Sequence, residues 1–155
     1  MQPDQDFSRL DERLFLRVPP GLIDPKAADI GIVSRRAIRF PVFSVNREKY
    51  SQRPNDVIRG YDGWSVISLS VGDLKRTYPV QPPKGAELVY EFKPVHDPNP
   101  PEDPDNDSHT NVCAFRDDIP IDGKVAKTAK TAFIDHLATR IVPLSEQDAN
   151  LPIKW

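Results

Sequence analysis

The chain has 155 residues, a formal net charge of −2, 38% hydrophobic residues and 17 prolines. This length predicts a single domain over 1–155, and the near-neutral charge indicates no class of partner for the whole molecule. The one cysteine excludes an intramolecular disulfide, and no apolar run approaches the ~18 residues of a membrane helix. The acidic start lacks signal-peptide features, so we expect a cytoplasmic protein without membrane contact.

The N-terminal part of the chain combines two patterns. Phe7, Leu10 and Leu14 follow helical spacing, whereas Leu14 alternates with Leu16 and Val18 as a strand does. We therefore predict a short helix that passes into an extended stretch.

Prolines limit the structure of the next two segments. Residues 30–45 are rich in β-branched and aromatic residues and predict a strand, which Pro41 restricts to an edge or a bulge. Residues 53–60 predict one or two helical turns, because Pro54 suits a first helical position and Gly60 suits a C-terminal stop.

Periodicity predicts the remaining elements. Alternating polarity predicts strands over 64–71 and 86–93, and a strand over 110–115 would pair with the second of them. Apolar residues at spacings of three and four predict an amphipathic helix over 124–141, followed by an extended tail over 144–155. These elements predict an α+β fold: a mostly antiparallel sheet of about four to six strands, with the C-terminal helix packed on one face and many proline-rich loops.

The centre of the chain is acidic and rich in proline. Residues 94–108 contain five prolines and five acids and no Lys or Arg. Proline lacks the amide donor of a central strand, so this segment predicts a loop between two strands. The loop could be a connector, a contact surface for a basic partner, or a cover over the basic segment described next. The residues that we expect to contact a partner are Asp103, Asp105 and Asp107 in the loop and Trp155 at the C-terminus.

Positive charge is concentrated in residues 35–59, where seven Lys and Arg residues face two acids. Cations neutralise phosphates and interleaved aromatic rings can stack on bases, so this composition suits a nucleic-acid groove. It also suits a strand and loop with one solvated charged face. The candidate nucleic-acid or phosphate ligands are Arg35, Arg36, Arg39, Arg47, Lys49, Tyr50 and Arg53.

His109 is the main candidate for a chemical role, because it stands where the acidic loop meets a predicted strand. A histidine can act as general acid or base near pH 7, and Asp107 could orient it. Cys113 would lie on the same strand face, either as a nucleophile or as a small buried hydrophobe. Together with His96, these residues lack the spacing of a structural zinc site, and no nucleotide-binding loop is present, so we predict no metal and no cofactor.

These features favour a protein-interaction module or a subunit of a larger complex, which would contact partners through the acidic loop and the C-terminal tail. One alternative is a metal-independent ribonuclease or other phosphodiester enzyme, with His109 as acid/base and Arg47, Lys49 or Arg53 holding the phosphate. A second alternative is nucleic-acid binding through residues 35–59. The sequence leaves open whether the protein is an enzyme.

Overall fold

The computed structural model describes residues 1–22, 38, 42–121 and 125–155. Within these residues the strands are β1 (Arg13–Val18), β2 (Val42–Arg47), β3 (Ser65–Ser70), β4 (Arg76–Val80), β5 (Leu88–His96), β6 (His109–Arg116), β7 (Ile119–Pro120) and β8 (Val142–Pro143). The helices are the 3-10 turns η3 (Glu48–Tyr50) and η4 (Pro54–Ile58), the one-turn α1 (Val71–Leu74), and α2 (Lys127–Ala138) and α3 (Glu146–Asn150).

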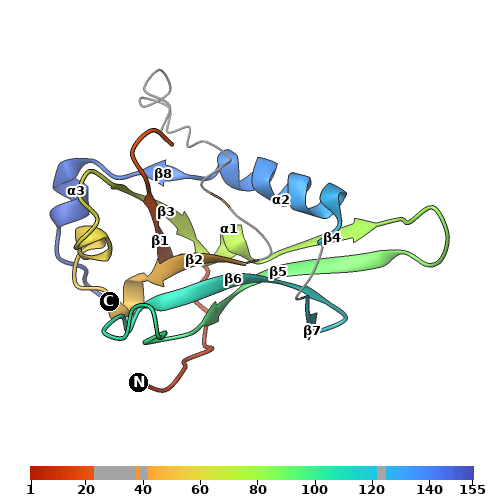
Figure 1. The fold of residues 1–155 in the computed structure, drawn as a ribbon, viewed down its shortest axis with the longest axis horizontal. Helices are drawn as coiled ribbons and strands as arrows, with labels where there is room; N and C mark the ends of the chain where they lie inside the picture. The colour runs from red at the N-terminus through yellow and green to blue at the C-terminus, as the bar shows by residue number, and fades with distance from the viewer. Residues whose placement is uncertain (23–37, 39–41, 122–124) are drawn as a thin grey trace.

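The strands form one 8-stranded sheet in the order β4-β5-β6-β2-β1-β3-β8, with β7 paired to β6. Every recorded pair is antiparallel. Helix α2 lies along one face of the sheet (Figure 1). This architecture confirms the predicted α+β class, and it confirms the pairing of the strands on either side of the acidic loop. The sheet has eight strands where four to six were predicted, and two of them, β7 and β8, are only two residues long.

The larger core lies between the sheet and α2. Phe133 of α2 stacks on Phe92 of β5 with ring centroids 4.2 Å apart, and Leu14, Leu16 and Val18 of β1 belong to the same buried cluster. The helix is shorter than the predicted 124–141, because it begins at Lys127 and ends at Ala138. The Thr139 and Arg140 amides donate to carbonyls three residues back, at His136 and Leu137, which closes the last turn.

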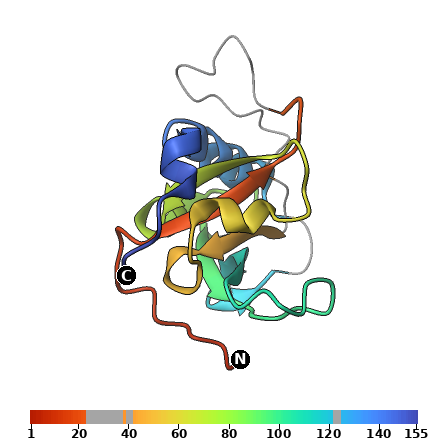
Figure 2. The same ribbon diagram turned by 90° about the vertical axis from the view of Figure 1, so that its left-hand side faces the viewer.

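A smaller core lies on the opposite face of the sheet. Side chains alternate along a strand, so Phe15 points away from α2 and packs with Val57 of η4 and Val66 of β3. Ile153 of the C-terminal segment packs against this cluster, and its backbone amide donates to the Gln52 carbonyl at 2.7 Å. Figure 2 looks onto this end of the molecule, where η4 and α3 lie close together.

Two predictions for the ends of the chain are wrong. Residues before Arg13 form no helix, because Arg47 binds the carbonyls of Asp4 and Asp6 and holds this segment extended. The tail over 144–155 is not wholly extended, because α3 begins at Glu146, where the Ser145 hydroxyl accepts a hydrogen bond from the Asp148 amide. A serine followed by two acids is a helix-start signal, and it could have predicted this turn.

The predicted boundary of the acidic loop is also wrong. Strand β5 continues through Pro94 to His96, so the loop covers residues 97–108 only. Pro94 lies opposite Val112 of β6, beyond the last pair between β4 and β5 at Phe92. At Pro94, β5 is therefore paired on one side only, and an edge strand of this kind tolerates a proline.

The predicted strand over 30–45 lies mostly outside the described residues, which include its end in β2. None of the helices in the described part of the chain is long and apolar enough to cross a membrane.

Candidate functional site

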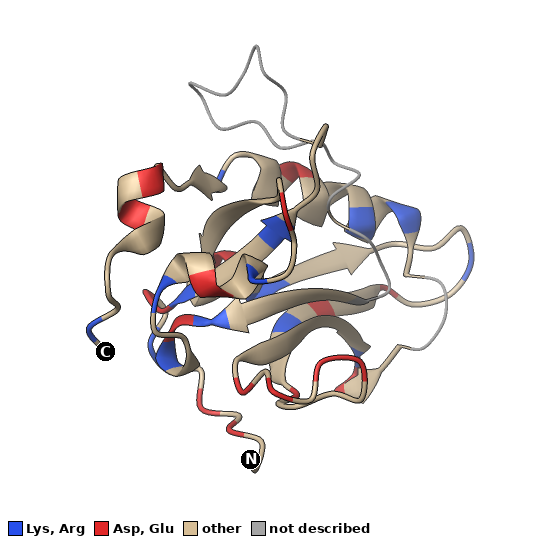
Figure 3. Cartoon of the chain, turned by 60° about the vertical axis from the view of Figure 1, so that its left-hand side comes forward, with Lys and Arg blue, Asp and Glu red and all other residues tan. Residues whose placement is uncertain are grey.

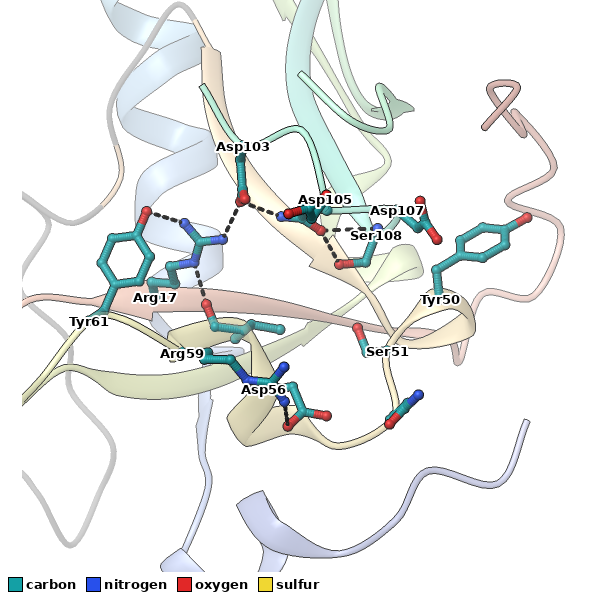
Figure 4. A pocket seen from close by; sticks show the side chains of 13 residues that line it. Arg17, Tyr50, Ser51, Asp56, Arg59, Tyr61, Asp103, Asp105, Asp107 and Ser108 are labelled. Atoms are coloured by element: carbon teal, nitrogen blue, oxygen red, sulfur yellow. Dashed lines mark hydrogen bonds and ion pairs between the residues drawn. The ribbon is translucent and has the colours of Figure 1, made fainter. Parts of the chain in front are cut away.

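The acidic loop and η4 stand on the sheet face opposite α2 and enclose a cleft of about 360 Å³, called here the acidic cleft (Figure 4). Its lining residues are Arg17, Tyr50, Ser51, Gln52, Asp56, Val57, Arg59, Tyr61, Asp103, Asp105, Asn106, Asp107 and Ser108. A neighbouring pocket of about 410 Å³, called here the aromatic pocket, shares some of these residues. It is lined by Leu16, Arg17, Phe43, Ser44, Asn46, Tyr61, Trp64, Glu102, Asp103 and His109.

Arg17 of β1 lines both cavities, and its contacts hold together the residues that separate them. Its guanidinium donates to the Val57 carbonyl, to the Tyr61 hydroxyl at 2.8 Å and to the Asp103 carboxylate at 3.1 Å. The same group lies 4.4 Å from the centre of the Tyr61 ring. Arg17 therefore joins the loop, η4 and the sheet, and much of its donor capacity is already used.

Hydrogen bonds within the acidic loop hold it in one shape. The Asn106 amide donates to Asn46 of β2 at 2.8 Å and to Asp103 at 2.9 Å, and its oxygen accepts from the backbone and hydroxyl of Ser108. Asn99, with a φ of 55°, donates to the Asp107 carboxylate at 2.8 Å. The loop is thus folded against the sheet.

The carboxylates of the cleft differ in their partners. Asp103 pairs with Arg17, and Asp56 of η4 pairs with Arg59 at 3.2 Å. Asp105 and Asp107 are exposed, and no cation is recorded beside either one in the described part of the chain. Figure 3 shows acidic residues gathered on the loop and on the N-terminal segment. The cleft therefore presents net negative charge to solvent.

The described residues of the basic segment form no continuous basic surface. Arg47 is fully buried, and its guanidinium is bound by Glu12 at 2.8 Å and by the Asp4 and Asp6 carbonyls. Its side chain is therefore not available to an external phosphate, contrary to the expected role. Lys49 pairs with Asp4 at 2.7 Å, and Arg53 is exposed. Arg35, Arg36 and Arg39 lie outside the described residues.

Asp4 is the centre of a network that the sequence did not indicate. Its carboxylate accepts from Lys49 and from the Tyr50 hydroxyl, and these bonds lower the pKa of Asp4. Its backbone amide donates to Nδ1 of His96, whose ring stacks on Tyr50 at 4.9 Å. Tyr50 therefore has its ring face and hydroxyl engaged within the protein.

His109 lies in the aromatic pocket and is only 7% exposed. Its Nδ1 is 2.8 Å from the Asp97 carbonyl oxygen, and its Nε2 is 3.2 Å from Oγ of Ser44 on β2. The carboxylate of Asp97, at 3.6 Å from Nδ1, takes the place expected for Asp107. Tyr50 lines the acidic cleft instead, so the structure does not bring it to His109.

The other candidate residues are placed apart from these cavities. Cys113 is half-buried, and burial raises the pKa of its thiol, which disfavours a thiolate nucleophile. Trp155 is 49% exposed, with the Arg9 guanidinium 4.1 Å from its ring centre. The described residues contain no group of three His, Cys, Asp or Glu side chains that could hold a metal ion.

No family model matches this chain, and neither a curated protein nor a solved structure matches it.

Proposed function

We propose that this protein is an interaction module whose acidic cleft binds an exposed, positively charged segment of a partner protein. The observation that carries the proposal is the pair of exposed carboxylates, Asp105 and Asp107, at a cleft that already holds two other acids. Opposite charge across an interface speeds association and selects the partner.

The rigidity of the loop supports this proposal. Asn106 and Asn99 fix the backbone around the carboxylates before a partner arrives, so little conformational entropy is lost on binding. Tyr61 is exposed and lines the cleft, and its contact with Arg17 at 4.4 Å shows that its ring suits a guanidinium. An arginine-containing peptide is therefore the ligand that this geometry favours.

Deletion of the acidic loop is an unsuitable test, because the loop also supports the fold. The Asp97 carbonyl binds His109, the Asp107 carbonyl binds His96, and the Ser108 carbonyl accepts from the Arg47 amide. The double variant Asp105→Asn/Asp107→Asn removes two charges with little change in shape. Asp117→Asn/Asp118→Asn is the matched control, because it removes two charges at the opposite end of β6, where φ values of 53° and 61° also suit asparagine.

The test is fluorescence anisotropy with a labelled peptide that carries two arginines, compared with the same peptide carrying citrulline. We expect the arginine peptide to bind more tightly, the Asp105→Asn/Asp107→Asn variant to weaken binding about tenfold, and rising salt to weaken it further. The control variant should bind as the parent does. Equal binding of the two peptides, or equal loss in both variants, would contradict the proposal.

A further inference from the structure

The aromatic pocket contains a hydroxyl and an imidazole in hydrogen-bond contact. Ser44 of β2 is exposed, and its Oγ lies 3.2 Å from Nε2 of His109 on β6. The register pairs Asn46 with His109 and Ser44 with Asn111, so Ser44 and His109 are diagonal neighbours on one sheet face. Both side chains are therefore positioned by regular strands.

The tautomer of His109 follows from its other contact. The Asp97 carbonyl oxygen can only accept a hydrogen bond, so Nδ1 carries the proton. In the neutral ring Nε2 then has a lone pair, and the Ser44 hydroxyl donates to it. This is the arrangement in which a histidine can remove the proton of a serine nucleophile.

The Asp97 carboxylate completes the arrangement. Its Oδ2 lies 3.6 Å from Nδ1 of His109 and accepts from the Asn111 amide at 3.2 Å. A negative charge at this distance stabilises the imidazolium that forms when His109 accepts a proton. Asp97 is therefore a positioning residue, and Ser44 and His109 are the groups that would meet a substrate.

We propose that Ser44 and His109 form a nucleophile and base pair that cleaves uncharged carboxylic esters. Ser44 Oγ attacks the ester carbonyl carbon while His109 Nε2 takes its proton, and Nε2 then protonates the leaving alkoxide as the carbon–oxygen bond breaks. Water attacks the acyl-serine in the same way, which releases the acid and returns the proton to Ser44.

The lining of the pocket determines the class of substrate. Tyr61 and Trp64, whose rings lie 5.0 Å apart in an edge-to-face arrangement, provide an aromatic wall. Glu102 and Asp103 add negative charge, and Arg17, the one cation among the described lining residues, is already bound to Asp103 and Tyr61. This environment disfavours phosphate esters and favours a neutral ester with an apolar or aromatic group.

The test measures cleavage of p-nitrophenyl butyrate and labelling by a fluorophosphonate, which forms an oxygen–phosphorus bond to the serine and releases fluoride. We expect the label on the peptide that contains Ser44, and a loss of about 100-fold or more in both signals for Ser44→Ala. The exposed position of Ser44 makes this variant compatible with the fold, and Ser65→Ala, in β3 and outside both cavities, is the control. An unlabelled parent, a label that persists in Ser44→Ala, or preferential cleavage of bis(p-nitrophenyl) phosphate would overturn the proposal.

Two further variants separate this site from its surroundings. Asp97→Asn should lower the maximal labelling rate about fivefold without changing the half-saturating probe concentration, because it removes the charge beside His109 and keeps the backbone contact. A change in the half-saturating probe concentration with no change in the maximal labelling rate would contradict the positioning role. Asp117→Asn/Asp118→Asn, outside both cavities, should label as the parent does. Peptide binding and ester cleavage are measured separately, so failure of one is distinguishable from failure of the other.

Discussion

Arg47 is a charged residue that the fold buries completely. Its partner Glu12 is 1% exposed, and the two form hydrogen bonds of 2.8 and 2.9 Å. The Arg47 guanidinium also lies 4.1 Å from the centre of the Phe7 ring. A buried pair of this kind ties the N-terminal segment to the sheet. Loss of the Glu12 charge leaves the buried guanidinium with the more distant Asp4 carboxylate, at 3.6 Å, as its charged partner among the described residues.

Glu12→Gln is therefore expected to destabilise the protein by about 3–5 kcal/mol, measured by urea unfolding. Glu48→Gln is the matched control, because Glu48 forms a 3.0 Å pair with Arg13, which is 37% exposed. Glu48 is 13% exposed and also accepts from the Arg13 backbone amide at 2.8 Å, so that variant should cost about 1–2 kcal/mol, less than Glu12→Gln. Equal effects of the two substitutions would show that the buried pair contributes no more to stability than the partly exposed one.

His96 should make stability depend on pH. Nδ1 accepts from the Asp4 amide and Nε2 donates to the Asp107 carbonyl, so the folded state holds the neutral ring. Burial, with a smaller effect from Arg47, lowers the pKa of His96 below its ordinary 6.5. Below pH 6.5 the unfolded chain therefore binds more protons than the folded chain. The contribution of His96 to the free energy of unfolding is fully present above that pH and is lost as the pH falls.

Unfolding measured between pH 7.5 and pH 5 on the parent, His96→Gln and His136→Gln would separate the contributions of the two histidines. Burial and the nearby Arg76 and Arg140 also lower the pKa of His136. His136 therefore also makes the free energy of unfolding decrease as the pH falls. We expect His96→Gln to be less stable and to show a shallower pH slope. A slope that His96→Gln leaves unchanged would rule out His96 as its source.

At the scale of elements, the loop over 97–108 shows why local sequence patterns do not predict the shape of a loop. Its prolines and acids predicted a loop between two paired strands, which is confirmed. The bonds that fold it depend on Asn46 and Arg17, residues 60 and 86 positions away from their partners Asn106 and Asp103. No local pattern encodes such contacts, so the shape of the loop could not be predicted.

Asn106→Ala tests whether the loop is held as described. Asn106 donates to Asn46 and accepts from Ser108, which is buried, so its truncation should cost about 1–3 kcal/mol. Hydrogen exchange of the loop amides should become faster in the same variant. Asp105→Asn, at an adjacent exposed position, should stay within about 0.5 kcal/mol of the parent. Unchanged stability and exchange in Asn106→Ala would mean that the loop is not ordered by this side chain.

At the scale of the whole molecule, periodicity predicted the fold class and the strand and helix types in the second half. The candidate site could be predicted only in part. His109 and the loop acids were identified from their positions, but Ser44 is 65 residues from His109 and meets it only because β2 pairs with β6. The charge surplus of residues 35–59 did not reveal that Arg47 is buried, because burial depends on Glu12 and the N-terminal segment.

The most direct test of the central claim, that the acidic cleft binds a cationic segment, is a titration of the isotope-labelled protein with the arginine peptide, followed by ¹H–¹⁵N NMR. We predict saturable shift changes concentrated in the amides of residues 50–61 and 103–108, absent with the citrulline peptide and reduced in Asp105→Asn/Asp107→Asn. Shift changes concentrated on α2 or spread evenly over the molecule, or no changes at millimolar peptide, would contradict the claim.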